Sequence, residues 1–149
     1  MLLSVVLGSA ALGTLLAVGL IWIDRGAPPG FRPPLVDRTV ETVTRADKGV
    51  RIHGYAHYGA RVELHAPEGR PSTYLFPLLA PMDTSGRQAH VVVRTKRAPD
   101  PLLGVEELTV EGVARNPLAL VPMTAWEQMV GRGYRFDDDY VVVVTFDAE

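Results

Sequence analysis

Histidines are the first candidates for metal chemistry in this chain. His53 and His57 fall on one face of a predicted strand, and His65 follows on the next run. Residues four apart on a strand lie about 13 Å apart along it, too far for both imidazoles to reach one ion unless the strand bends. Gly54 and Gly59 could supply that bend, so a metal or heme ligand among these histidines stays an alternative. We prefer histidines exposed on a half-buried strand, and we expect no metal and no cofactor.

The run Asp137 to Asp139 is a second candidate for cation binding. Three consecutive carboxylates point in divergent directions, and the run lacks the alternating ligands and the glycine turn of a calcium loop. We therefore expect a solvated turn before the last strand. Ser72 and Ser85 have no nucleophile-elbow context, and no carboxylate pair can be given a catalytic separation. The sequence thus predicts no enzyme, and a membrane-tethered enzyme is the least favoured alternative.

Basic side chains gather between Arg87 and Arg97, whereas acidic residues gather later in the chain. The net charge is only -2, so the charge is polarised and not basic overall. Nucleic acid requires a dominating positive field and stacking aromatics, and this segment has no aromatic residue, so we expect no nucleic-acid partner. Polarised faces suit a protein partner or an anionic lipid surface. The predicted partner-binding residues are Arg87, Arg94, Lys96, Arg97 and Trp126.

The stretch from Leu2 to Ile23 contains no charged residue. About 20 apolar residues are enough for a helix to cross a hydrocarbon core of roughly 30 Å. A cleaved signal peptide would need a basic start and a shorter apolar run. Trp22 stands where an interfacial aromatic belongs, and Asp24 and Arg25 end the run. Residues 1–23 are therefore predicted to form a transmembrane anchor.

Small residues recur every fourth position within this predicted span, at Ser9, Gly13 and Ala17. They would line one face of a helix, where small side chains let a second helix approach closely. These three residues are the predicted site of intramembrane packing.

Prolines at positions 28, 29, 33 and 34 mark residues 24–39 as a linker. They forbid a continuous helix and favour an extended, semi-rigid chain. The rest of the chain, 40–149, is predicted to be one soluble β domain.

Short apolar or alternating runs punctuated by Gly and Pro indicate strands in this domain. In the first run Ile52, Gly54, Ala56 and Tyr58 share one face, as in a half-buried strand. Pro77 cannot donate a ladder hydrogen bond, so it is expected at a strand end, an edge or a bulge. The predicted strands lie within 50–58, 60–64, 72–80, 90–95, 105–115 and 140–146.

One helix is predicted over 124–133. Thr124 would cap its first turn together with Glu127, and Gly131 would supply a left-handed stop. Trp126 and Met129 would face the sheet, together with Val130. The fold class is thus mainly β: an N-terminal transmembrane helix, then a small antiparallel barrel or sandwich with one short helix, an oligonucleotide-binding-fold-like barrel being one candidate.

The motifs "VRIHGYAHYG", "STYLFPLLAPMDTSGRQAHVVVRTKRAPD", "LTVEGVARNP", "AWEQMVGRG" and "YVVVV" follow one another in this chain. Their order resembles a shortened member of the Surfeit-locus (Shy-type) cytochrome oxidase assembly factors. In that family a strand ending in glycine precedes a Pro-Leu strand, a strand with a basic residue, a V-x-G strand with a following Arg, and a Trp-bearing helix. The matching positions, within 50–144, are Gly54, Pro77, Leu78, Val93, Arg94, Val110, Gly112, Arg115 and Trp126.

The chain departs from the family pattern in two places. Thr95 and Lys96 stand where the family usually has Gly-Trp, and the second membrane helix that usually ends family members is not expected here. Since the family's heme-associated histidine is expected in that helix, the resemblance assigns no heme ligand. It implies that the strands around 90–95 and 105–115 pair into a docking surface with a basic loop, and that Gly112 marks a close backbone approach or a bulge.

The predicted function is that of a single-pass, membrane-anchored, non-catalytic β domain that helps to assemble or stabilise a membrane protein complex. The resemblance implies an outer-face domain whose partners are oxidase subunits, beside the lipid bilayer. Charge favours the other side: Arg25 and Arg32 follow the span and nothing basic precedes it, which by the positive-inside rule favours a cytoplasmic domain. The alternative function is a generic scaffold or accessory subunit of a membrane complex that faces the cytoplasm.

Overall fold

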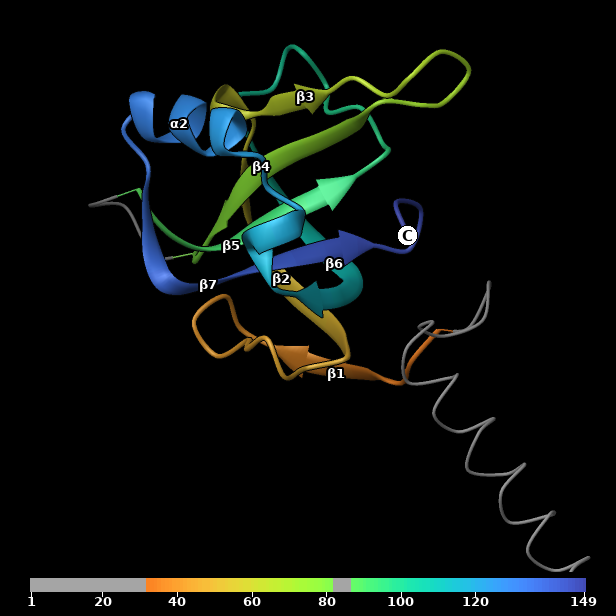
Figure 1. Cartoon of the computed structure of the whole chain (residues 1–149). Helices are drawn as coiled ribbons and strands as arrows, with labels where there is room; N and C mark the ends of the chain where they lie inside the picture. The colour runs from red at the N-terminus through yellow and green to blue at the C-terminus, as the bar shows by residue number, and fades with distance from the viewer. Residues whose placement is uncertain (1–31, 82–86) are drawn as a thin grey trace, which may run out of the picture. The chain divides into compact units, whose positions relative to one another are not determined.

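Seven β-strands form one sheet that closes on itself in the computed structural model of the chain (Figure 1). The structure describes residues 32–81 and 87–149. The strands β2, β6, β7, β5 and β4 are hydrogen-bonded in that order, and β4 returns to β2 to complete a five-stranded barrel. The strands are β1 (Leu35–Arg38), β2 (Gly49–His57), β3 (Val62–Leu64), β4 (Thr73–Leu79), β5 (Gln88–Thr95), β6 (Val105–Arg115) and β7 (Arg135–Thr145).

The predicted small β-barrel is confirmed, but its sheet is mixed and not fully antiparallel. β5 and β7 pair in parallel, and so do β1 and β2. The β5–β7 pair requires a crossover, which contains β6, the 3-10 turn η2 (Pro117–Ala119) and the helix α2 (Met123–Gly131). The helix of this crossover packs through Ala125 and Met129 on the outer face of the sheet.

The closed barrel encloses one apolar cluster to which all five of its strands contribute. A second cluster lies on the outer face of β4, β5 and β7, under α2 and η2. These three strands are therefore buried on both faces, which explains their continuous apolar runs. In β5, for example, Val91 and Val93 belong to the enclosed cluster, whereas Ala89 and Val92 belong to the outer one.

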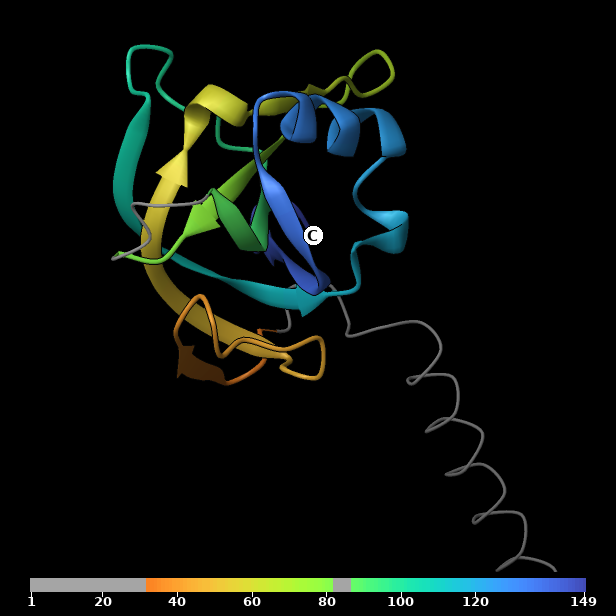
Figure 2. The ribbon, with the colours of Figure 1, turned by 90° about the vertical axis from the view of Figure 1, so that its left-hand side faces the viewer.

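β2 and β6 follow the other pattern, because their outer faces meet solvent. They run side by side over their full length and curve around the barrel (Figure 2). Ile52, Gly54 and Ala56 are buried as predicted, while Arg51 and His53 are exposed. Alternating apolar and polar residues thus indicate the strands of the barrel whose outer faces are exposed to solvent.

Pro77 was expected at a strand end, an edge or a bulge. It lies inside β4 and not at a strand end. β4 pairs with β3 at Thr73–Leu75 and with β2 at Leu78 and Leu79, so Pro77 falls between the two partners. The missing N–H of proline is tolerated at such an interruption of pairing.

The predicted helix is confirmed, but the prediction of its capping residues is wrong. α2 begins at Met123 and Pro122 is the N-cap, with no side-chain capping bond, so Thr124 and Glu127 do not form a capping box. The carbonyl of Pro122 accepts from the N–H groups of the first turn. The left-handed glycine after the helix is Gly133, with a φ of 91°, and not Gly131.

β5 and β6 are not neighbours in the barrel, so the expected docking surface of two paired strands with a basic loop is wrong. β5 lies between β4 and β7, and β6 lies between β2 and β7. The loop between β5 and β6 crosses the barrel end, because β6 pairs with β2 over residues 105–113 and not with β5.

The segment predicted as a linker contains β1, which pairs with β2 from Leu35↔Gly49 to Arg38↔Ile52. The loop after it is held by Arg38, which donates to the Asp47 carboxylate over 2.9 Å, and the Thr44 N–H donates to the same carboxylate. The Arg38 hydrogen bond is the largest of the effects that hold the pKa of Asp47 below its ordinary value.

Acid should weaken this loop through Asp47. Because the pKa of Asp47 is lowered in the folded state, its stabilising contribution is present above the ordinary aspartate pKa of about 4 and is lost as the pH falls through the folded value. We expect Asp47→Asn to flatten part of the decline in unfolding free energy below about pH 4, measured by urea unfolding across pH. The exposed Glu68→Gln is the control for loss of one carboxylate, and an equal flattening there would contradict the assignment.

No helix within 32–81 and 87–149 is long and apolar enough to cross a membrane. The predicted anchor at 1–23, with Ser9, Gly13 and Ala17, lies outside the described residues.

Candidate functional site

The basic residues predicted to bind a partner do not form one surface. Arg87 directly precedes β5 and Arg94 lies near its other end. Seven residues of extended strand separate them by about 23 Å. Lys96 and Arg97 follow in the exposed loop after β5. The structure therefore spreads the predicted patch along one strand and around the end of the barrel.

Two of these arginines are also engaged within the fold. Arg87 donates to the carbonyl of Arg132 over 2.6 Å, and its guanidinium lies 5.4 Å from the centre of the Tyr134 ring. Arg94 donates to the carbonyl of Leu120, and its Nε is buried. Both side chains fix the crossover segment to the barrel, which is a structural role.

Trp126, the remaining predicted contact residue, lines a groove of about 590 Å³ between η2, α2 and β7. It is half-buried and its ring lies 6.4 Å from that of Phe136, which packs on the outer cluster. The other side chains around the groove are mostly apolar, and they are Arg45, Asn116, Pro117, Leu118, Val121, Pro122, Met123 and Tyr140.

Two large apolar side chains of this groove are exposed to solvent. Leu118 is 91% exposed and Met123 is 68% exposed. Asn116 fixes the turn that presents Leu118, because its side chain accepts a hydrogen bond from the Leu118 N–H. Exposed apolar side chains grouped around a concave surface are typical of a protein interaction site. We call this surface, lined by the residues given above, the η2–α2 groove.

The charged member of the η2–α2 groove is Arg45, which comes from the loop after β1. Its guanidinium donates to the carbonyls of Asp138 and Tyr140 over 3.0 and 3.2 Å. These acceptors are neutral, so Arg45 gives the groove a positive charge. An apolar segment with a carboxylate at one end would match this lining.

A second cavity, of about 370 Å³, opens at the end of the barrel beside the loop after β5. Its polar pair is Tyr58, whose hydroxyl donates to Glu106 over 2.5 Å. Burial, and then the Glu106 carboxylate, raise the pKa of Tyr58. The phenol is therefore a neutral donor bound to its own carboxylate, an arrangement that closes the barrel end and offers no activated nucleophile.

The three histidines considered as metal ligands have separate partners. His53 contacts Glu107 and Thr109, His57 contacts the Tyr134 hydroxyl, and His65 contacts Glu63. His53 and His57 lie on β2, and His65 directly follows β3.

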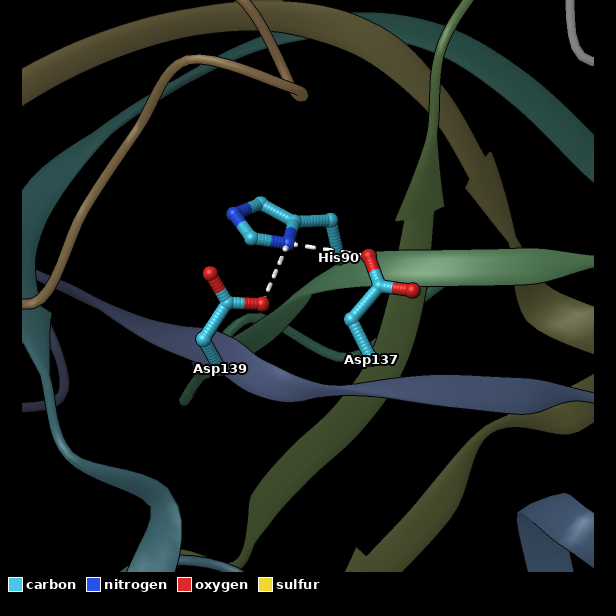
Figure 3. Close-up of side chains that lie close together, drawn as sticks. All are labelled: His90, Asp137 and Asp139. Atoms are coloured by element: carbon cyan, nitrogen blue, oxygen red, sulfur yellow. Dashed lines mark hydrogen bonds and ion pairs between the residues drawn. The ribbon is translucent and has the colours of Figure 1, made fainter.

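His90, by contrast, lies beside Asp137 and Asp139 (Figure 3). The expected solvated turn is wrong: the three aspartates belong to β7, and Asp137 is half-buried. His90 and Asp137 are 47 residues apart, and the parallel β5–β7 pairing that joins them was not predicted.

No family model, no curated protein and no solved structure matches this chain.

Proposed function

We propose that this protein is a non-catalytic docking domain, tethered to a membrane by its N-terminal segment, that holds a partner protein of a membrane complex in the η2–α2 groove. The observation that carries this proposal is the exposure of Leu118 and Met123 beside Trp126 in one groove. Burying apolar surface contributes about 25 cal/mol per Å², so these side chains are suited to be the central contacts of an interface.

Three further observations support the proposal. The uncharged run from Leu2 to Ile23 has the length and composition of a membrane span. The five-stranded barrel, with its Greek-key-like order and one parallel pair, supports an oligonucleotide-binding-fold-like architecture, a scaffold on which binding sites recur. Nucleic-acid binding is disfavoured, because Arg87 and Arg94 donate to backbone carbonyls of the fold and the segment 87–97 has no aromatic residue on which a base could stack.

The respiratory oxidase remains our preferred complex, on the resemblance to the Surfeit-locus assembly factors. The alternative is a scaffold or accessory subunit that faces the cytoplasm, favoured by Arg25 and Arg32 after the apolar run. Reporter fusions at Glu149 that are active on one side of the membrane separate the two. A reporter active outside the cytoplasm favours oxidase assembly, and one active inside favours the scaffold.

The substitution Leu118→Asp tests the docking site. We expect the variant to be released from its complex, because a carboxylate would have to be buried in an apolar contact. The measurement is the size of the detergent-solubilised complex that contains the full chain, by native electrophoresis. Leu118 is 91% exposed, so the fold should tolerate the change.

Leu102→Asp is the matched control. Leu102 is 90% exposed, on the loop after β5 and away from the residues that line the η2–α2 groove. We expect Leu102→Asp to stay in the complex. Release of both variants, or of neither, would contradict the assignment of the groove.

A further inference from the structure

A bulge in β7 faces His90. Ala89 pairs with Phe136 and Val91 pairs with Val141, so one residue of β5 lies opposite the four residues 137–140 of β7. Extra residues in one strand change the direction in which its side chains point, and such bulges are common beside functional sites. Here the bulge brings the carboxylates of Asp137 and Asp139 to the same imidazole (Figure 3).

The bulge is held in place from the loop after β1. Arg45 donates to the carbonyls of Asp138 and Tyr140, which flank Asp139. From the same loop, the carbonyl of Val43 lies 3.0 Å from His90 Nε2. The loop therefore positions both the imidazole and the bulged backbone.

The hydrogen bond to Val43 determines which nitrogen of His90 carries its proton. A carbonyl oxygen accepts only, so Nε2 must donate, and in a neutral imidazole Nδ1 then carries a lone pair. Nδ1 lies 3.0 Å from an Asp137 oxygen and 3.6 Å from an Asp139 oxygen. Because Nε2 is directed to Val43, Nδ1 is the ring nitrogen that faces both carboxylates, and a cation placed there would contact all three side chains.

The hydrogen bonds around this cluster are those expected around a metal centre. Metal-binding histidines usually donate their other ring N–H to a carbonyl or carboxylate, and ligating carboxylates are themselves hydrogen-bonded. His90 donates to Val43, and Asp137 accepts from the Gln88 amide through the oxygen that does not face His90. Asp139, with its side chain 82% exposed, leaves one side open to water.

The spacing of the ligand atoms is close to that around a bound ion. Around an ion bound at about 2.1 Å, adjacent ligand atoms lie about 3.0–3.4 Å apart in octahedral or tetrahedral geometry. His90 Nδ1 lies 3.0 Å from Asp137 and 3.6 Å from Asp139, and all three ligand atoms lie within 4.8 Å of one another, so the exposed Asp139 side chain would move inward on binding. We propose that these three side chains bind a divalent transition-metal ion, Zn²⁺ being the best match to one imidazole and two carboxylates, with water in the remaining positions. This inference is independent of the docking function.

Zinc binding to the full chain, purified in detergent without a histidine tag, tests the proposal. A competition titration against a chromophoric chelator should give one Zn²⁺ per chain. His90→Gln should weaken binding by at least about 100-fold, since even outer-shell changes cost about 10–100-fold. Asp139→Asn should weaken it by at least about tenfold. Because this side chain is 82% exposed, that variant remains informative if His90→Gln does not fold.

His53→Gln is the matched control, because His53 is exposed and is paired with one carboxylate, that of Glu107, where His90 faces two. It should bind Zn²⁺ as the wild type does. A wild type that takes up no zinc would overturn the proposal. Equal affinities of the wild type and Asp139→Asn would also overturn it, as would displacement of zinc by an equal concentration of Ca²⁺, which would indicate a site of oxygen ligands.

Discussion

Met129→Ala should lower the free energy of unfolding by about 2–5 kcal/mol, the range for truncating a fully buried large apolar side chain. Met129 has no exposed surface and lies in the outer cluster, between α2 and the strands β4, β5 and β7. The loss combines the missing transfer free energy with the cavity left behind. Because α2 carries Trp126 and Met123, the same change should loosen the η2–α2 groove.

Urea unfolding of a fragment covering 32–149 measures this loss. Val130→Ala is the control, since Val130 is the next residue of the same helix and is 37% exposed. We expect its loss to stay below about 1 kcal/mol. Equal losses at the two positions would mean that α2 is not docked through Met129.

Gly112→Ala should be costly for the opposite reason, because the added atom has no room. A Cβ at position 112 would lie 2.2 Å from the carbonyl oxygen of Val144 and 2.8 Å from its carbonyl carbon. These are backbone atoms of the neighbouring strand β7, so no side-chain rotation relieves the overlap. Overpacking typically costs about 1–3 kcal/mol, and we expect a loss of about 3 kcal/mol here because strand pairing must shift.

The same urea experiment serves for this substitution, with Gly59→Ala beside it. Gly59 has no atom within 4 Å of an added Cβ, so its replacement should change the unfolding free energy by less than about 1 kcal/mol. Native stability of Gly112→Ala would contradict the close approach of β6 and β7. The sequence had predicted a close backbone approach or a bulge at this glycine, and the structure confirms the approach.

Most of the fold was predicted from local patterns of apolar and polar residues in the sequence. The alternation around Ile52 and the β-branched run of β7 each correspond to a strand, because burial on one face or both sets those patterns. β1 was missed, since Pro33 and Pro34 precede it and a four-residue strand has little pattern of its own. Strand order was not predictable, because the parallel β5–β7 contact joins residues far apart in the chain.

The candidate sites were less predictable than the fold. Trp126 was identified because a lone tryptophan on a short helix stands out, whereas Leu118 and Met123 resemble any core residue until their exposure is known. In the sequence, His90 falls within the basic segment between Arg87 and Arg97, and Asp137 falls within a run expected to be a solvated turn. The contact between His90 and Asp137 depends on a bulge in which four residues of β7 lie opposite one residue of β5. The sequence has no local signal for such a bulge.

The central claim is that the η2–α2 groove contacts a membrane partner. Its most direct test is photocrosslinking in intact membranes, with a photoreactive amino acid placed at Leu118 in one variant and at Leu102 in the other, two positions of nearly equal exposure. We predict a crosslink to an integral membrane protein from position 118 and none from position 102. Equal crosslinking from both positions, or a position 118 that crosslinks to no protein, would contradict it.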